Sequence, residues 1–393
     1  MDKAFCIRFE KAGETRIVLP GGACCPVTYF SGKGGSVVLN RARRNFWLLA
    51  RVVTAYIGAV IGAGFASGQE IMQFFVLHGR SGLLGAAVTA LLFAYLGGLI
   101  MFLSVKMKSA SYRDIFAFLL GERAGGIMDA LNIFMLLGGL SVMMAGSAAV
   151  FEEQFGLPAR AGVWAVTVLS SLVVLGGLEG VLAANVFLVP LKFLAVVAVS
   201  TAALCASRHL AQSSGTGWQG GGAGGHWLPA AFLYVSYNIV VPLAVLSSLG
   251  RMVPPVLGLA GGALGGLLLG MAVSLVTLAG LAYMPEASFC QIPLLYLAGH
   301  LGQGFRHLLG LLIWLAILTT AIADAHGFAS RLAPEGGSRY RFCGIFACLL
   351  ALPLSSFSFA GLVRLLYPLF GLAGLVLLAA LLFVPPFKSL RKF

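Results

Sequence analysis

Charged residues are scarce in this sequence. Asp, Glu, Lys and Arg make up 10% of its 393 residues, whereas about 25% is usual for a soluble domain. Hydrophobic residues make up 59%, and the mean hydropathy is +0.96. This composition excludes a soluble globular fold and predicts an all-α integral membrane protein.

Motifs for metal binding and enzymatic chemistry are also missing. The seven cysteines form no CxxC pair and no Cys/His spacing typical of zinc sites. HExxH, GxSxG, Walker A and paired-acid patterns are absent, so neither an enzyme nor a resident cofactor is expected. The net charge is +13, and the charged residues lie between apolar runs. This distribution favours the lipid bilayer over nucleic acid as the partner.

Long apolar runs dominate what is present. A membrane-spanning helix needs about 20 apolar residues, and the sequence contains about ten such runs. They lie at 46–78, 82–106, 125–151, 160–178, 180–206, 227–250, 256–284, 304–329, 340–355 and 360–385. The Gly/Ser-rich stretch 210–226 reads as a flexible outer loop between two five-helix halves, 41–209 and 227–387, with a basic C-terminus at 388–393.

The distribution of basic residues predicts the orientation. Placing the N-terminus in the cytoplasm puts fourteen Lys and Arg residues on the inner side and four on the outer side. The positive-inside rule therefore predicts a multi-pass protein of a bacterial-type inner (plasma) membrane with both termini cytoplasmic.

Residues 1–40 differ from the rest. They carry five Lys or Arg residues and no apolar run long enough for a signal peptide, so we expect a disordered tail. Lys33-Gly34-Gly35 can be encoded by a purine-rich stretch that resembles a bacterial ribosome-binding site, and Val37 or Val38 could then be a GTG start. We hypothesise that the native protein begins there, which an intact mass from native upstream DNA would test.

The first run contains closely spaced glycines, among them Gly58, Gly62 and Gly68, which let helices pack closely or let a helix unwind. Ser67 and Glu70 match an S-x-x-E capping box, which predicts a helix start inside the run. Interrupted helices at bilayer depth line cavities or lie buried in protein, and transporters bind solutes there. We therefore expect a break near Gly62 to Ala66, with simple helix packing as the alternative. The expected solute-binding residues are Gly62, Ala63, Gly64, Phe65, Ala66, Ser67 and Gly68.

The sixth run offers a second break. Proline removes a backbone donor at Pro242, and the polar side chains of Ser236, Tyr237 and Asn238 can serve the freed groups or a solute. The alternative is a proline kink with interfacial tyrosines.

Three segments carry a resemblance to a known family. GAVIGAGFASGQE at 58–70, YVSYNIVVPLAVL at 234–246 and LVRLLYPLFG at 362–371 resemble the YkvI-type bacterial membrane proteins. That family is similar to the five-plus-five inverted-repeat transporters, the leucine-transporter-like fold. The resemblance covers about residues 46–385 and implies about ten helices in two inverted five-helix repeats, with the first and sixth helices broken.

The resemblance also implies an ion site. In sodium-coupled members of the fold, the first and eighth helices supply carbonyl and hydroxyl ligands, which match Gly58, Ile61, Ala316, Thr319 and Thr320 here. The alternative is that Thr319 and Thr320 bond back onto their own helix. Phe65 stands where the other sodium site has an asparagine, so no second sodium is expected.

Lys192 and Glu70 are candidates for proton coupling instead. Lys192 lies in the middle of the fifth run, too deep to snorkel comfortably, and a charge at that depth is costly unless it is partnered or neutralised. A fifth-helix lysine replaces sodium in proton-coupled amino-acid transporters of this fold, and Lys192 resembles it. Glu70 either caps its half-helix or faces the outer vestibule, where it could take a proton or an amine.

Arg51 and Asp324 lie inward of Gly58 and Thr320, so their side chains could meet as an inner gate or as a structural tether. These features favour a secondary transporter of a small organic solute that is coupled to Na⁺ or H⁺. The resemblance suggests an amino acid or related amine. Its carboxylate would be held by free amides near Ala66 to Gly68. The alternative is a membrane sensor or assembly partner without transport activity.

Overall fold

The computed structural model describes residues 8–11, 14–17, 33–108, 112–176, 179–207 and 222–390, which fall into two units, Met1–Trp47 and Leu48–Phe393. In the first unit, β1 (Arg8–Lys11) pairs antiparallel with β2 (Glu14–Ile17). The first helix, α1 (Lys33–Val60), also begins in this unit. The two strands and the start of α1 fall within residues 1–40, the tail for which we predicted disorder. The rest of that tail lies outside the described residues.

The second unit is helical in its described part. After α1 its elements are α2 (Ala63–Ser67), α3 (Gln69–Phe74), η1 (Val76–His78), α4 (Arg80–Lys106), α5 (Tyr112–Phe155), α6 (Ala159–Gly176), α7 (Glu179–Ala206), α8 (Trp227–Asn238), α9 (Val240–Ser248), α10 (Pro255–Ala282), η2 (Glu286–Phe289), α11 (Pro293–Leu301), α12 (Gln303–Leu332), α13 (Gly337–Ala351), η3 (Leu354–Ser356) and α14 (Phe359–Leu390). A non-helical residue, Gly121, divides α5. Most of the expected loop 210–226 lies outside the described residues.

Eight helical segments of the described chain are long and apolar enough to cross a membrane. They include α4, α6, α10 and α12, and their surfaces carry large exposed apolar side chains, such as Leu91 on α4 at 69% exposure and Val256 on α10 at 77%. Lipid contact accounts for such exposure, which water would penalise. The chain is thus a multi-pass, all-helical membrane protein in its core.

Two of the expected runs are not among these eight. The run 46–78 is divided among α1, α2, α3 and η1, and the run 340–355 contains only the 15-residue α13 followed by η3. The other expected runs coincide with the eight candidate spans to within a few residues, apart from 180–206, of which 188–206 forms the candidate span.

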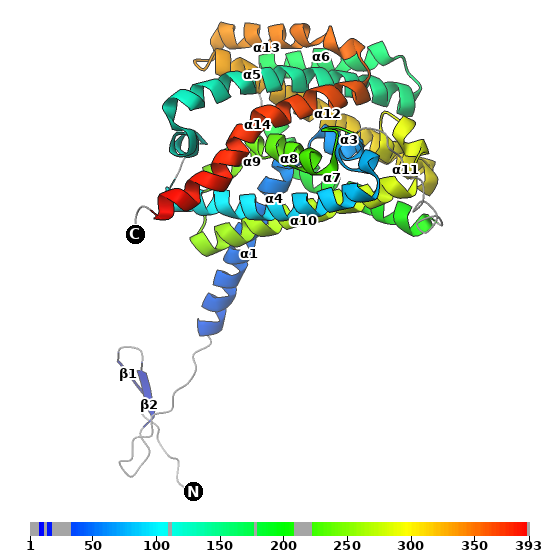
Figure 1. The fold of residues 1–393 in the computed structure, drawn as a ribbon. Coiled ribbons are helices and arrows are strands. Elements are labelled where there is room, and N and C mark those ends of the chain that lie inside the picture. The colour runs from blue at the N-terminus through cyan, green and yellow to red at the C-terminus, as the bar shows by residue number, and fades with distance from the viewer. Residues whose placement is uncertain are drawn as a thin grey trace. The chain divides into compact units, whose positions relative to one another are not determined.

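Close glycine contacts hold the core together. Helices α4 and α10 lie side by side (Figure 1), and a side chain on Gly97 of α4 or Gly262 of α10 would strike the backbone of the opposite helix. Tyr56 of α1 donates from its hydroxyl to the Phe93 carbonyl of α4 at 3.0 Å. These contacts fix α1 against the α4–α10 pair and so position the interruption that follows α1.

Candidate functional site

The first helix is interrupted at Ile61 and Gly62, which are not helical. The Gly62 amide donates to the Val60 carbonyl at 2.8 Å, instead of to the Gly58 carbonyl four residues back. The Gly58 carbonyl therefore lacks its helical partner and is available to another donor or to a cation. A Cβ on Gly62 would have no neighbour within 4 Å, so the backbone borders open space at this point.

The unwound segment is shorter than expected. We predicted a break from Gly62 to Ala66, but Ala63–Ser67 is helical and forms α2. The Ala66 amide donates to the Gly62 carbonyl at 3.1 Å, and the Gly68 amide donates to the Phe65 carbonyl at 3.0 Å. The Ala66 and Gly68 amides are thus already hydrogen bonded in this conformation, which leaves neither of them free for the substrate carboxylate that we predicted there.

A second interruption occurs at Gly68. This residue has a φ of +81°, a left-handed conformation that glycine adopts without strain, and it separates α2 from α3. A Cβ on Gly68 would also lie 2.9 Å from the Leu294 side chain of α11. The turn therefore needs glycine both for its backbone conformation and for the close approach of α11.

The capping box predicted at Ser67 and Glu70 does not form, although a helix does begin beside it. The Ser67 hydroxyl donates to the Gly64 carbonyl at 2.8 Å and accepts from the Gln69 amide at 3.3 Å. Glu70 instead accepts a hydrogen bond from the Tyr237 hydroxyl of α8 at 2.8 Å. The Glu70 carboxylate therefore bonds to a residue of another helix instead of capping the start of its own helix.

Glu70 is the best-defined polar centre of this region. It is 4% exposed, and Tyr367 of α14 supplies a second hydroxyl to its carboxylate in addition to Tyr237. Carboxylate atom Oε1 lies directly against Gly64, where a Cβ would overlap it. Three elements, α3, α8 and α14, therefore meet at one buried carboxylate, beside the glycine that packs under it.

Aromatic rings surround this carboxylate. The ring centroid of Tyr237 lies 5.1 Å from that of Tyr367, 5.6 Å from that of Tyr234 and 5.8 Å from that of Phe74. The Tyr234 hydroxyl is buried without a hydrogen-bond partner among the described residues. We call Glu70, Tyr234, Tyr237, Tyr367 and Phe74 the Glu70 cluster.

The polar residues of α8 divide into two groups. The Ser236 hydroxyl donates to the carbonyls of Leu233 at 2.8 Å and Gly371 at 2.7 Å, and the Asn238 amide donates to the Tyr234 carbonyl at 3.0 Å. Ser236 and Asn238 are thus committed to backbone groups of α8 and α14. Of the three residues predicted on this helix, Tyr237 is the one that contacts the interrupted first run, through Glu70 of α3.

The sixth run is not unwound at its centre. Ile239 separates α8 from α9, yet its φ of −87° and ψ of −15° are helical. Its amide donates to the Val235 carbonyl at 3.0 Å, and the Leu243 amide donates to the Ile239 carbonyl at the same distance. The irregularity is local and lies next to Pro242, in agreement with the proline-kink alternative.

The predicted ligands of the ion site lie on α1, at Ile61 in the interruption and on α12, and α12 packs against α2. The hydroxyls of Thr319 and Thr320 both donate to the Ala316 carbonyl, at 3.1 and 2.8 Å. This is the back-bonded arrangement that the sequence left open. A hydroxyl that donates keeps its oxygen lone pairs, so both threonine oxygens remain available as acceptors.

Lys192 is 4% exposed on α7, and no described side chain pairs with its amine. It stands three residues after Val189, whose side chain lies 3.0 Å from the position of a Cβ on Gly58. Residues three apart share a helix face, so Lys192 is on the side of α7 that faces the first helix. Its burial agrees with the prediction that it does not snorkel.

The predicted inner gate is not formed. Arg51 is exposed on α1, whereas Asp324 lies against Gly139 of α5, with Oδ2 2.7 Å from where a Cβ would stand. Asp324 thus packs against α5, and no ion pair joins it to Arg51 in the described part of the chain. The expectation that Arg51 and Asp324 meet is therefore not fulfilled in this structure.

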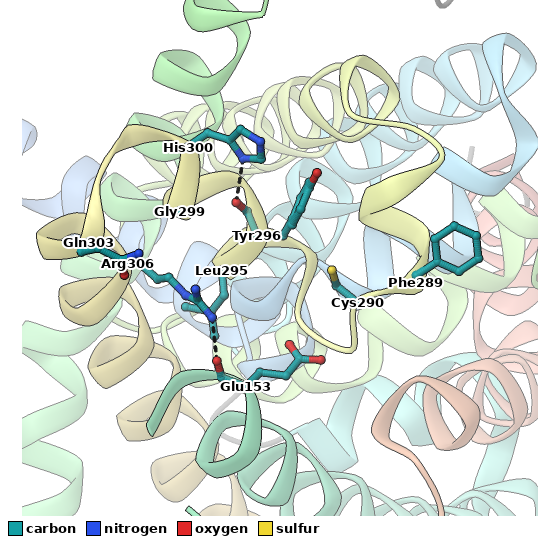
Figure 2. A pocket seen from close by; sticks show the side chains of 9 residues that line it. All are labelled: Glu153, Phe289, Cys290, Leu295, Tyr296, Gly299, His300, Gln303 and Arg306. Carbon is teal, nitrogen blue, oxygen red and sulfur yellow. Dashed lines mark hydrogen bonds between the residues drawn. The ribbon is translucent and has the colours of Figure 1, made fainter. Parts of the chain in front are cut away.

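A pocket of about 490 Å³ that the sequence analysis missed lies where α5 ends and α12 begins (Figure 2). The Arg306 guanidinium donates to the Glu153 carbonyl at 2.6 Å, and the Glu153 carboxylate accepts from the Gln291 amide at 2.8 Å. Burial raises the pKa of the Cys290 thiol, and the Glu153 carboxylate adds to this effect. These contacts tie the start of α12 and the segment before it to α5, and no local sequence pattern signalled them.

Segment α11 lies between this pocket and the interrupted helix. Leu295 lines the pocket, whereas its neighbour Leu294 contacts Gly68. None of the predicted site residues lines the pocket.

Comparisons with known proteins place the chain in a family. The membrane protein YkvI of Bacillus subtilis (strain 168) is 31% identical over 339 residues, which cover 85% of this chain and 95% of the relative. YyaD of the same strain is 29% identical over 340 residues, which cover 84% and 94%. No protein-family model matches the chain.

A solved structure shares the fold. A mutant of the Eremococcus coleocola manganese transporter superposes with a TM-score of 0.54 at 14% identity, over 85% of this chain and 78% of the other. YkvI is named as a membrane protein and this neighbour as a transporter, and none of the three is named as an enzyme. The resemblance read from the sequence is confirmed by the match to YkvI, and the chain belongs to the YkvI family of membrane proteins.

Proposed function

We propose that this protein is a secondary transporter that moves a small organic solute, an amino acid or related amine, across a bacterial-type plasma membrane. The observation that carries the proposal is the interruption of the first helix at Ile61 and Gly62, inside a helical membrane bundle. Free backbone groups at such interruptions are how many transporters hold solutes and ions near the midplane. The shared fold with a protein named as a transporter supports the same function.

The proposed architecture completes the eight candidate spans with the divided first run and with α13. This gives ten spans in two inverted five-helix repeats, with both termini in the cytoplasm. The bias of fourteen basic residues to four supports this orientation. Alternating access would then rock one group of helices against the other around the interrupted helix.

The coupling ion has three candidate sites, one for sodium and two for a proton. The free Gly58 carbonyl and the threonine oxygens of α12 are hard ligands that suit sodium. The buried amine of Lys192, without a described partner, could instead carry a proton through the cycle. Glu70 is the second candidate for a proton.

The first experiment compares the thermal stability of the purified full chain in sodium and potassium across pH. A rise of several degrees specific to sodium, lost in Thr320→Ala and kept in Lys192→Met, supports sodium at the α1–α12 site. A pH dependence that Lys192→Met removes, without a sodium effect, supports proton coupling. If the wild-type chain shows neither the sodium effect nor the pH dependence, that result contradicts coupling to both ions.

Concentrative uptake into proteoliposomes separates transport from sensing. We expect Gly62→Leu to abolish uptake, because its side chain would fill the open space beside the interruption. Binding of the solute without uptake in the wild type would favour the sensor alternative.

A further inference from the structure

The Glu70 cluster contains an acid without a base. No Lys, Arg or His among the described residues interacts with the Glu70 carboxylate; the groups that do are the hydroxyls of Tyr237 and Tyr367. The other titratable groups that interact electrostatically with these tyrosines are Tyr234 and a second acid, Asp324 of α12, which acts on Tyr367. A buried carboxylate in such surroundings attracts positive charge.

The hydrogen-bonding groups of the cluster are mostly acceptors. Because the Tyr237 hydroxyl donates its hydrogen to Glu70, its oxygen lone pairs remain free to accept from a ligand. The Tyr234 hydroxyl of the same cluster is buried without a hydrogen-bond partner among the described residues, so its oxygen can accept as well. A ligand rich in N–H donors would match these acceptors.

The same geometry disfavours a ligand carboxylate. The amides of Ala66 in α2 and of Gly68 after it are bonded to backbone carbonyls, and the Glu70 carboxylate already lies against Gly64. An anion placed there would meet the negative charge of Glu70 and find no described basic side chain to offset it. The aromatic rings of the cluster, in contrast, attract cations through their faces.

We propose that the Glu70 cluster binds the ammonium group of an organic amine that has no carboxylate, with Glu70 as its counter-ion. This assignment rests on the proposed transport function only for the fate of the ligand, because binding can be measured by itself. It narrows the solute class from amino acids and amines to alkyl or arylalkyl amines.

The test compares amines with the amino acids from which they differ by one carboxylate. The probes are isobutylamine against L-valine, and phenethylamine against L-phenylalanine, with 2-methyl-1-propanol as a neutral control. The readout is the shift in melting temperature of the purified full chain as each probe is titrated. We expect at least one amine to raise the melting temperature, and the amino acids and the alcohol to have no effect.

Variants locate the site. Glu70→Gln keeps the shape and an acceptor for Tyr237, and we expect it to weaken amine binding about tenfold or more, because a charge-assisted contact is lost. Glu70→Asp should restore part of the affinity. Glu153→Gln, which alters another acid of the bundle, should leave the amine-induced shift unchanged. If Glu70→Gln does not fold, Tyr367→Phe, which removes only one hydroxyl, should still weaken the amine-induced shift.

Four results would overturn the assignment: no shift with either amine, a shift with the amino acids as large as with the amines, an amine-induced shift that survives Glu70→Gln, or a shift by Na⁺ or K⁺ alone that Glu70→Gln removes. Failure of the transport proposal looks different. Amine binding without amine counterflow in proteoliposomes would support this site and contradict transport. Amino-acid uptake without amine binding would support transport and contradict this site.

Discussion

At the scale of single residues, the site depends on a glycine that lies beneath an acid. Gly64 has no side chain, and the Glu70 carboxylate occupies the position that a Cβ would take. The Glu70 side chain can therefore pack against the backbone of α2 while its carboxylate contacts Tyr237 and Tyr367. The GAGF segment is thus explained by packing as much as by helix unwinding.

A pair of alanine substitutions tests this reading. We expect Gly64→Ala to destabilise the protein by about 1–3 kcal/mol, because the new methyl group overpacks a buried site and displaces the Glu70 carboxylate. Gly62→Ala should leave stability unchanged or raise it slightly, because its Cβ meets open space and its φ of −85° suits alanine. The melting temperatures of the two variants in one detergent are the measurement. Equal losses would contradict the contact with Glu70.

At the scale of elements, close backbone approach sets the helix pairs. Gly262 of α10 faces the Gly97 carbonyl of α4, and Gly266 faces the Phe93 carbonyl one turn farther along. Small residues at a four-residue spacing let helices in a membrane approach closely, where dispersion forces between them are strongest. The α4–α10 pair then supports α1 through Tyr56.

Gly262→Ala should therefore separate α4 from α10 and lower the melting temperature, at a cost of about 1–3 kcal/mol or more. The added methyl group would strike backbone, which yields less readily than a flexible side chain. Gly304→Ala near the start of α12 is the matched control, because a Cβ there meets nothing within 4 Å. A Gly262→Ala variant as stable as the control would show that the two helices are less tightly packed.

At the scale of the whole molecule, the proposed orientation can be tested by cysteine labelling. It places Cys290, between η2 and α11, outside the cell and Ser338, at the start of α13, inside. In a chain whose other cysteines are replaced, a membrane-impermeant maleimide should label Cys290 on intact cells. Ser338→Cys, with Cys290 also replaced, should be labelled only after lysis.

Labelling of Cys290 should also accelerate as the pH rises. The thiolate is the reactive form, and burial together with the Glu153 carboxylate raises the pKa of this thiol, so less of it is ionised at neutral pH. Labelling of Ser338→Cys but not of Cys290 on intact cells would show that the protein has the opposite orientation in the membrane.

The sequence predicted the positions of most helices well. Apolar runs marked the eight candidate spans, because each long helix in lipid must be apolar over about 20 residues. It also located the interrupted first helix through its glycines, although the unwound part is confined to Ile61 and Gly62. The proline of the sixth run was a weaker signal, since a helix can bend around Pro242 without unwinding.

Side-chain roles were harder to predict. Ser236 and Asn238 were expected at the solute site, yet they bond to backbone carbonyls, because polar groups buried in a helical bundle take the nearest acceptor. Glu70 was expected to cap its helix, and Tyr237 of another helix bonds to it instead. Arg51 and Asp324 were expected to meet, yet Arg51 is exposed and Asp324 packs against Gly139 of α5.

The sequence by itself therefore determined the membrane class, the family and the place of the interruption, since these follow from apolar length, local motifs and glycine spacing. Only the tertiary structure decided which side chains meet there. The Glu70 cluster joins residues from α3, α8 and α14, and the pocket at Glu153 joins α5 to the segment before α12. Contacts between helices so distant in the chain depend on how each helix is rotated about its axis and shifted along it relative to its neighbours. The sequence pattern of a single helix does not specify either.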